Sequence, residues 1–210
     1  MTEPAAKLPA TRPEVIPHHA ASLLVLRHRA EGGPEILMGL RGANHKFMPN
    51  RLVFPGGRVD AADHRAAHAS DLRPHVLRAL ARSAEGSLPR AIAIAAAREL
   101  EEETGLTLGL PPELLPLDYL ARAITPPPSP IRFDARFLLA DAEHVTGTLA
   151  GSGELEDLRW YGMDDALSLD LALPTRGVLL QLREWLGMSA AQREDRALVP
   201  TLRNRGWELE

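Results

Sequence analysis

The chain has 210 residues, of which 45% are hydrophobic and 25% charged, an ordinary balance for one globular domain with a sizeable core. Its net charge of −4 argues against a general nucleic-acid-binding protein, and the absence of cysteine excludes disulfides and thiolate metal sites. No apolar run is long enough to span a bilayer, and the first residues lack the pattern of a signal peptide. We therefore expect a cytoplasmic protein with no membrane partner.

The first part of the chain predicts an arm followed by a hairpin. Residues 1–17 contain four prolines without periodicity, which indicates an extended or disordered arm. Apolar runs at 20–28 and 35–41, separated by a glycine-containing turn, predict two strands of a hairpin. A short strand at 52–54 then ends at Pro55-Gly56-Gly57.

Two helices are predicted next. Val76, Leu77, Leu80 and Ala81 form an apolar stripe at helical spacing after Pro74. The main helix is predicted over 91–104, with Ser87 as its cap, Pro89 in its first turn and Gly105 as its stop.

The rest of the chain predicts further strands and a late helix. We expect strands at 117–124, 131–140 and 158–161, an amphipathic helix at 176–186, and a polar tail over 188–210. Strands that alternate with a central and a late helix indicate an α/β sandwich.

Three acidic residues of the main helix are the strongest functional signal. Glu99, Glu102 and Glu103 stand at i, i+3 and i+4, so they share one helix face. Like charges at that spacing repel unless a cation lies among them. Hard cations such as Mg²⁺ or Mn²⁺ prefer carboxylate oxygens, with water and substrate phosphate completing the shell. The spacing therefore predicts a divalent-metal site for phosphate chemistry.

The residues around these acids resemble a known family. The segment 98–106 reads Arg-Glu-Leu-Glu-Glu-Glu-Thr-Gly-Leu, a pattern of charged and apolar types that arises by chance about once in 10⁷ positions. It resembles the second half of the Nudix box, G-x5-E-x7-R-E-U-x-E-E-x-G-U, and Phe54-Pro55-Gly56-Gly57 resembles the opening of that box. The resemblance implies an α/β/α sandwich, the Nudix fold, across about residues 18–187. It also implies a pyrophosphohydrolase that cleaves a nucleoside diphosphate linked to another group.

The resemblance also implies roles for single residues. Glu102 and Glu103 are expected as metal ligands, and Glu99 as a third ligand or as the base that activates water. The main-chain carbonyl of Gly56 is a further expected ligand. Arg98 is expected to orient a carboxylate through a bidentate contact. The catalytic set is thus Glu99, Arg98 and Glu102.

Two features depart from the family pattern. Gly57 and Arg98 are 41 positions apart instead of the pattern's 14, so 27 extra residues lie inside the box, at about 61–88. Counted back from Arg98, the first Glu of the box is replaced by Arg90, which puts the rigidity of the loop in question. The insertion carries the apolar stripe, and we expect it to form a helical flap beside the substrate cleft or part of a homodimer contact.

The stretch before the box suggests a substrate. Its spacing resembles that of coenzyme A pyrophosphatases of the Nudix family, with basic residues at Arg41 and Lys46, and Arg58 follows the two glycines. These cations are expected to bind the diphosphate or the 3′-phosphate of a small-molecule coenzyme A or acyl-CoA substrate. Their alternative role is that of ordinary surface cations in a loop.

Other possibilities stay open. Glu154 and Glu156 are candidates for an additional acid from a later loop, although a polar loop beside a strand explains each of them alone. Instead of coenzyme A, the substrate could be ADP-ribose, a dinucleotide or a nucleoside triphosphate. A catalytically silent nucleotide-sensing domain is the alternative from another class, and the intact acids argue against it.

Overall fold

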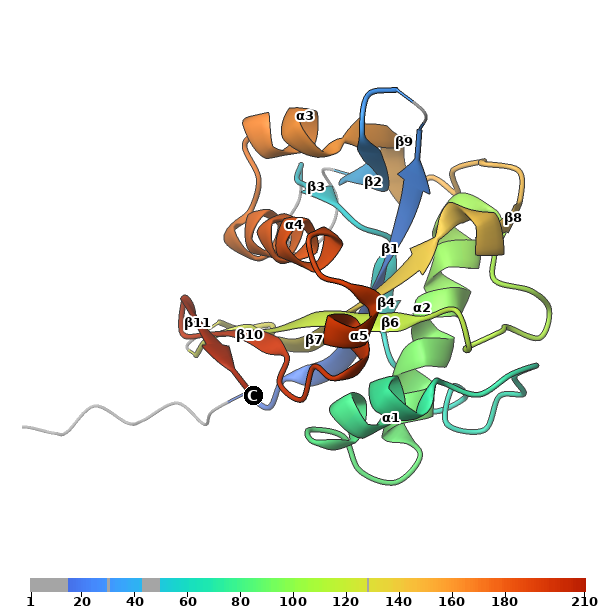
Figure 1. Cartoon of the computed structure of the whole chain (residues 1–210), viewed down its shortest axis with the longest axis vertical. Coiled ribbons are helices and arrows are strands. Elements are labelled where there is room, and N and C mark those ends of the chain that lie inside the picture. The colour runs from blue at the N-terminus through green and yellow to red at the C-terminus, as the bar shows by residue number, and fades with distance from the viewer. Residues whose placement is uncertain (1–14, 30, 43–49, 128) are drawn as a thin grey trace, which may run out of the picture.

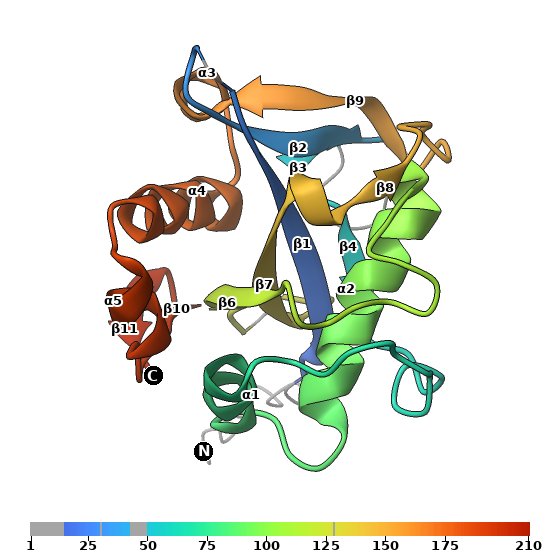
Figure 2. The same ribbon diagram turned by 45° about the vertical axis from the view of Figure 1, so that its right-hand side comes forward.

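The computed structural model describes residues 15–29, 31–42, 50–127 and 129–210, and most of the expected arm (residues 1–14 of 1–17) and Lys46 lie outside them. In these residues nine strands form one mixed sheet, ordered β11-β10-β6-β7-β1-β2-β3, with β4 paired to β1 and β9 paired to β2. Helices cover both faces of this sheet, α1 and α2 on one and α3 and α4 on the other (Figures 1 and 2). The architecture is the α/β/α sandwich that the sequence predicts.

The strands follow the apolar runs of the sequence. Their bounds are β1 His18–His28, β2 Pro34–Arg41, β3 Leu52–Val53, β4 Gly56–Arg58, β5 Leu106–Thr107, β6 Asp118–Ile124, β7 Phe133–Asp141, β8 Thr146–Gly147, β9 Leu155–Gly162, β10 Pro200–Arg203 and β11 Gly206–Leu209. The small pair β5–β8 forms a separate sheet. The central strand β1 pairs in parallel with β7 and antiparallel with β2, and it is buried on both faces because helices pack on both sides of the sheet. Leu23 and Val25 pack toward α2, whereas Leu24 and Leu26 pack toward α4.

The helices are α1 Pro74–Ala81, α2 Leu88–Thr104, α3 Met163–Ser168, α4 Leu173–Leu186 and α5 Ala190–Glu194, with a 3-10 turn, η1, at Ala142–His144. Helix α2 ends at Gly105, whose φ of 72° is left-handed and favours glycine. Ser87 stands at its N-cap, but the Ser87 hydroxyl contacts the His64 ring at 2.8 Å and caps no backbone amide. None of the helices in the described part of the chain combines the length and apolar character that a bilayer span requires.

The apolar stripe of the insertion is part of the domain core. Val76 and Leu80 on α1 are 2% and 0% exposed, and they pack with Ile92 of α2 and Tyr119 of β6. Leu77 is only partly buried and Ala81 is exposed. Val76 and Leu80 are thus buried within their own domain and need neither the expected flap nor a dimer contact for that. The apolar surface of α1 is covered by packing against α2 and the sheet.

The segment 188–210 does not form a separate tail. Strand β10 pairs in parallel with β6 and antiparallel with β11, and Leu202 is buried against α4 and β6. The expected end of the domain at 187 thus lies too early. Each of these strands has only four residues, too few for a clear alternation of apolar and polar side chains.

Candidate active site

The C-terminal turns of α2 meet the loop between β3 and β4. Glu103 turns inward and is 3% exposed. Its Oε2 accepts a hydrogen bond from the backbone N–H of Gly56 at 2.8 Å. Burial raises the pKa of Glu103 to about 7, the Gly56 N–H opposes this rise, and the charge of Glu99 adds to it. A negative charge at Glu103 is costly without a cation close by.

Glu99 lies one turn earlier, against the second glycine of the loop. A Cβ placed on Gly57 would stand 2.3 Å from Oε1 of Glu99, so any larger residue there would force this carboxylate to move. Burial raises the pKa of Glu99, and the neighbouring Arg98 guanidinium opposes that rise. The loop and the helix are therefore packed with two acids directly at their contact.

Arg98 holds the acids of the helix in place. Its Nη1 donates to Oε1 of Glu99 at 2.9 Å and to Oε2 of Glu102 at 3.1 Å. Its Nη2 donates to the backbone carbonyl of Arg58 at 2.9 Å, which ties the helix to the end of β4. Glu102 is the most exposed of the three expected ligands, with 57% of its side chain accessible. Arg98 thus contacts two carboxylates and the loop, in line with an orienting role.

Asp63 is a site residue that the sequence analysis missed. Its carboxylate is 2% exposed and accepts from Nε and Nη2 of Arg98, both at 3.1 Å. Counted forward from Gly57, Asp63 stands where the box has its first Glu, so the extra residues follow this position. The expectation that Arg90 replaces that acid is therefore wrong, and Arg90 instead pairs with Asp71 at 2.6 Å on the surface. Counting the box forward from Gly57, as well as backward from Arg98, identifies Asp63 from the sequence.

The donor set of this site fits a hard divalent cation. Glu99, Glu102 and Glu103 offer only carboxylate oxygens, and Arg98 contacts one oxygen of Glu99 and one of Glu102. Among the described residues no three acidic or histidine side chains already converge as a complete metal site. The carboxylates would have to close around an ion, and the buried Glu103 has most to gain because its charge is the least solvated.

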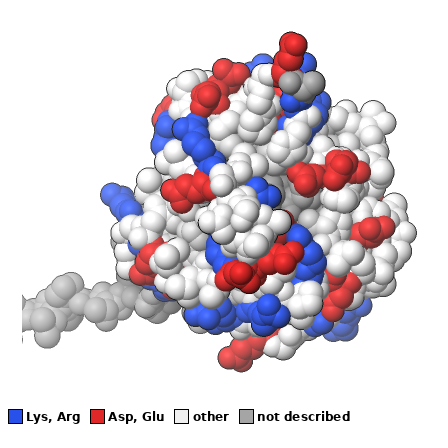
Figure 3. Space-filling model, viewed as in Figure 1, with Lys and Arg blue, Asp and Glu red and all other residues white. Residues whose placement is uncertain are grey.

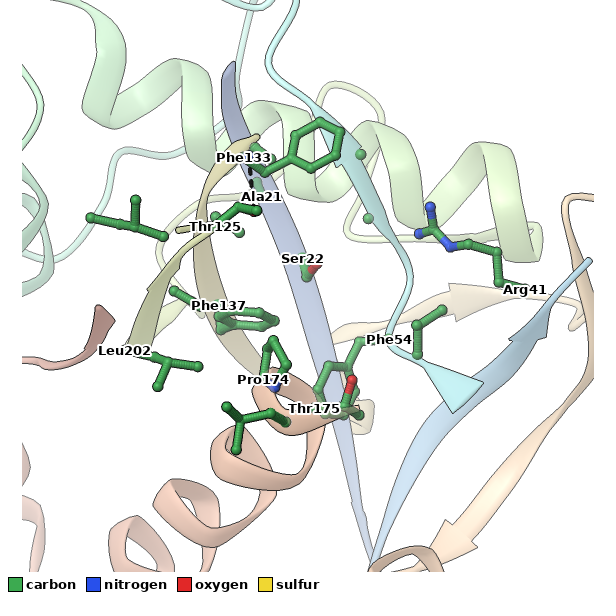
Figure 4. A pocket seen from close by; sticks show the side chains of 18 of the residues that line it. Ala21, Ser22, Arg41, Phe54, Thr125, Phe133, Phe137, Pro174, Thr175 and Leu202 are labelled. Carbon is green, nitrogen blue, oxygen red and sulfur yellow. Dashed lines mark hydrogen bonds between the residues drawn. The ribbon is translucent and has the colours of Figure 1, made fainter. Parts of the chain in front are cut away.

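A pocket of about 270 Å³ opens beside the two glycines, between the sheet and the start of α4 (Figure 4). The rings of Phe54, Phe133 and Phe137 line it, and Pro174 and Leu202 add further apolar surface. The hydroxyls of Ser22, Thr125 and Thr175 and the guanidiniums of Arg41 and Arg205 are the polar groups of the lining. Among the described residues no carboxylate or carboxamide side chain lines this pocket. An apolar group or a flat ring therefore fits this pocket better than a group that is recognised through hydrogen bonds to its edge.

The predicted phosphate-binding cations differ in their surroundings. Arg41 lines the pocket, its charge lowers the pKa of Glu103, and its buried Nε has no hydrogen-bond partner in the described residues. Arg58 is exposed, and its guanidinium lies 5.6 Å from the centre of the Phe133 ring at the pocket edge. Of the two, Arg41 is better placed for an anion that reaches the acids.

The two candidate extra acids are separated by the fold. Glu154, in the loop before β9, is close enough for its charge to raise the pKa of both Glu99 and Glu103. Glu156 is exposed, within β9 and opposite Leu40 of β2. The geometry therefore favours Glu154.

Comparisons with known proteins agree with this geometry. Residues 90–182 match the family model of the NUDIX domain. A NUDIX hydrolase from Alicyclobacillus acidocaldarius is similar in structure, with a TM-score of 0.63, 28% identity, and coverage of 79% of this chain and 90% of that one. No curated protein matches the chain.

Two further solved structures share the fold. One is a MutT NUDIX hydrolase from Burkholderia pseudomallei, with a TM-score of 0.51, 22% identity, and coverage of 80% and 99% of the two chains. The other is RenU, a Nudix hydrolase from M. smegmatis, with a TM-score of 0.52, 20% identity, and coverage of 81% and 86%.

Proposed function

We propose that this chain, of which residues 90–182 match the NUDIX domain and which is similar in structure to a NUDIX hydrolase, is a divalent-metal-dependent pyrophosphohydrolase acting on coenzyme A or an acyl-CoA. The coarser part, a hydrolase of nucleoside-diphosphate-linked substrates, rests on the NUDIX domain itself. The observation that carries the metal dependence is the buried Glu103 on the Gly56 amide, with its pKa raised to about 7.

The residues divide the work of hydrolysis between them. Mg²⁺ or Mn²⁺, when bound, would neutralise phosphate charge and favour the ionised form of a coordinated water. Glu102 and Glu103 would hold the ion together with the carbonyl of Gly56. Glu99, whose pKa is raised by burial, is suited to accept a proton from the attacking water. Arg98 keeps Glu99 and Glu102 oriented through the contacts described above.

Arg41 and the apolar pocket support the substrate class. A coenzyme A ester offers a diphosphate for the metal, and an adenine ring and an apolar acyl chain for a pocket without carboxylates or carboxamides in its described lining. Arg41 stands between this pocket and Glu103, where a phosphate oxygen could pair with its guanidinium. Lys46 and Arg58 are proposed as further phosphate contacts.

Two other functions remain as alternatives. ADP-ribose, a dinucleotide or a nucleoside triphosphate could use the same acids, since the chemistry is shared. A silent nucleotide sensor would need no metal-dependent turnover, and the retained carboxylates on Arg98 speak against it.

A substrate panel with product identification tests this proposal. Coenzyme A, an acyl-CoA, dephospho-coenzyme A, ADP-ribose and a nucleoside triphosphate are incubated with enzyme and Mg²⁺ or Mn²⁺. We expect the coenzyme A compounds to be cleaved with the highest kcat/KM and no turnover in chelator. Faster cleavage of ADP-ribose or a triphosphate would contradict the substrate class and leave the metal chemistry intact. No turnover of any substrate would favour the sensor.

Within the same panel, Arg41→Ala separates two positions for this cation. If Arg41 binds the 3′-phosphate, the KM for coenzyme A should rise about tenfold or more, with little change for dephospho-coenzyme A. Equal losses on both substrates would assign Arg41 to the diphosphate. Arg159→Ala, which removes an exposed arginine of β9 outside the pocket, is the matched control and should leave both constants unchanged.

A further inference from the structure

A second pocket lies on the opposite face of the same strands. It has a volume of about 460 Å³ and is lined by residues of α1, β6 and the β10–β11 hairpin: Ala79, Arg82, Ser83, Tyr119, Arg122, Val199, Thr201, Arg203 and Glu210. None of the acids on α2 belongs to this lining. The candidate active site therefore makes no use of it.

Guanidinium groups outnumber carboxylates around this pocket. Arg82, Arg122 and Arg203 line it, and the fully buried Arg136 lies behind them on Asp134 at 2.9 Å. Arg122 also pairs with Asp134, at 2.7 Å, and Arg203 with Glu208, at 2.8 Å. Four cations thus face Asp134, Glu208 and Glu210.

The Glu210 carboxylate bridges two of these cations inside the pocket. Its Oε2 accepts from Nη1 of Arg122 at 2.7 Å, and its Oε1 accepts from Nη2 of Arg203. A carboxylate held between two guanidiniums makes the contacts that a phosphate group would make in its place. The side chain of Glu210 is 32% exposed, so it can leave the pocket while the backbone of Glu210 keeps its two hydrogen bonds to Val199.

Two further polar groups of the lining are left without a strong partner. Tyr119 is only 4% exposed, yet its hydroxyl forms no hydrogen bond within the described residues. Arg82, at the C-terminal end of α1, has no ion pair in that part of the chain. The Tyr119 hydroxyl is not among the buried polar atoms that lack a partner in the described residues, so it is reachable from the pocket that it lines and can donate to an oxyanion there.

We propose that this pocket binds a small phosphate or phosphate-ester oxyanion in exchange for the Glu210 carboxylate, with Arg122, Arg203 and the Tyr119 hydroxyl as donors. Strand β10 links the two pockets, since Arg203 lines this one and the adjacent Leu202 lines the apolar pocket. An anion that moves Glu210 would therefore act on the wall of the candidate substrate pocket. The site itself does not depend on the hydrolytic activity.

Calorimetric titration of the full chain with inorganic phosphate tests the exchange. Chelator is present throughout, so that no metal recruits phosphate to the acids of α2. We expect Glu210→Gln to bind phosphate about tenfold or more tightly than the wild-type protein, because the internal competitor loses its charge. Tyr119→Phe, made in the Glu210→Gln background, should weaken the affinity several-fold. Arg203→Ala should abolish binding, and Arg159→Ala is the control.

A second titration distinguishes the source of the phosphate. Adenosine monophosphate is compared with inorganic phosphate on Glu210→Gln: tighter binding of the nucleotide indicates a phosphate ester, and equal or weaker binding indicates the free ion. The proposal is overturned if Glu210→Gln, shown to be folded by its melting curve, binds phosphate no more tightly than wild type. It is equally overturned if phosphate binding survives Arg203→Ala.

Discussion

Asp63 and Arg98 form a two-pronged ion pair, Nε to Oδ1 and Nη2 to Oδ2, both at 3.1 Å, that closes the box across its insertion. Asp63 is 2% exposed, and its Oδ2 also accepts a hydrogen bond from the backbone N–H of Asp60 at 2.7 Å, so Arg98 is the cation that balances its buried charge. The same guanidinium reaches Glu99 and Glu102 from its other side. Asp63 is therefore a positioning residue for the acids, although it contacts neither of them.

Asp63→Ala should weaken both stability and activity. Removing one partner of a buried pair costs about 3–5 kcal/mol, which urea denaturation would measure. In the protein that remains folded, kcat should fall more than KM changes, because Arg98 no longer fixes Glu99. Asp63→Glu should restore most of the rate. If Asp63→Ala lowers stability but leaves kcat intact, the pair is only structural.

Neutralising a metal-binding acid should cost at least ~10²-fold in rate, comparable to other losses of transition-state charge stabilisation. We expect this for Glu103→Gln and Glu102→Gln, assayed over a range of Mg²⁺ or Mn²⁺ concentrations. Glu101→Gln is the matched control, since Glu101 is an exposed acid of the same helix turn and belongs to no contact described above. Full activity of Glu103→Gln in excess chelator would end the metal assignment.

The raised pKa of Glu103 predicts how the stability of the metal-free protein depends on pH. The folded-state pKa is about 7, whereas that of the unfolded chain is about 4.3. Between these values the folded protein binds more protons than the unfolded one, so stability falls as pH rises from about 4.3 to 7. Above pH 7 the full cost of the buried charge is present.

Thermal melting in chelator measures this dependence. Glu103→Gln should show a smaller loss of Tm across the same pH window, because glutamine carries no proton to lose. Addition of Mg²⁺ at pH 8 should raise the Tm of the wild-type protein more than that of Glu103→Gln. Parallel pH profiles for the two proteins would show that Glu103 does not titrate in this range.

The insertion should behave as part of the core. Leu80 is 0% exposed among α2 and β6 residues, so Leu80→Ala should cost about 2–5 kcal/mol of unfolding free energy. Leu77 on the same helix is only partly buried, and Leu77→Ala is the control with a smaller expected loss. Deletion of residues 66–82 should abolish folding. If the shortened protein keeps its stability, the segment is only a tolerated loop and not part of the core.

The parts of the fold that sequence predicts best are those with local signals. The main helix has alanine-rich composition and a glycine stop, and the strands at β1, β2, β6 and β7 are apolar runs bounded by turns. The C-terminal strands are not predicted from the sequence, because the pairing of β10 with β6 depends on residues about 80 positions away. A four-residue strand has no local signature strong enough to reveal such a partner.

The sequence points to the three acids of the candidate site but not to the residues that surround and orient them. The spacing of Glu99, Glu102 and Glu103 is local, so one helix suffices to bring them to one region. Glu103 faces inward because the Gly56 amide offers it a hydrogen bond, and nothing in the helix pattern shows that partner. The apolar pocket collects side chains from β1, β2, β3, β6, β7, β10 and α4, a grouping that only the tertiary fold creates.

The alternation of side chains along β6 and β10 fixes how these strands must pair. Ala123 and Leu202 face the apolar pocket, while their neighbours Arg122 and Arg203 face the second pocket, where the Glu210 carboxylate is bound. A slip of one residue in either strand would exchange the two faces, bringing a guanidinium among phenylalanine rings and a leucine among ion pairs. Each burial of an unpaired cation costs several kcal/mol, so the side chains on both faces of these strands disfavour a shifted register. We expect single-residue insertions or deletions in either strand to be far less tolerated than substitutions there.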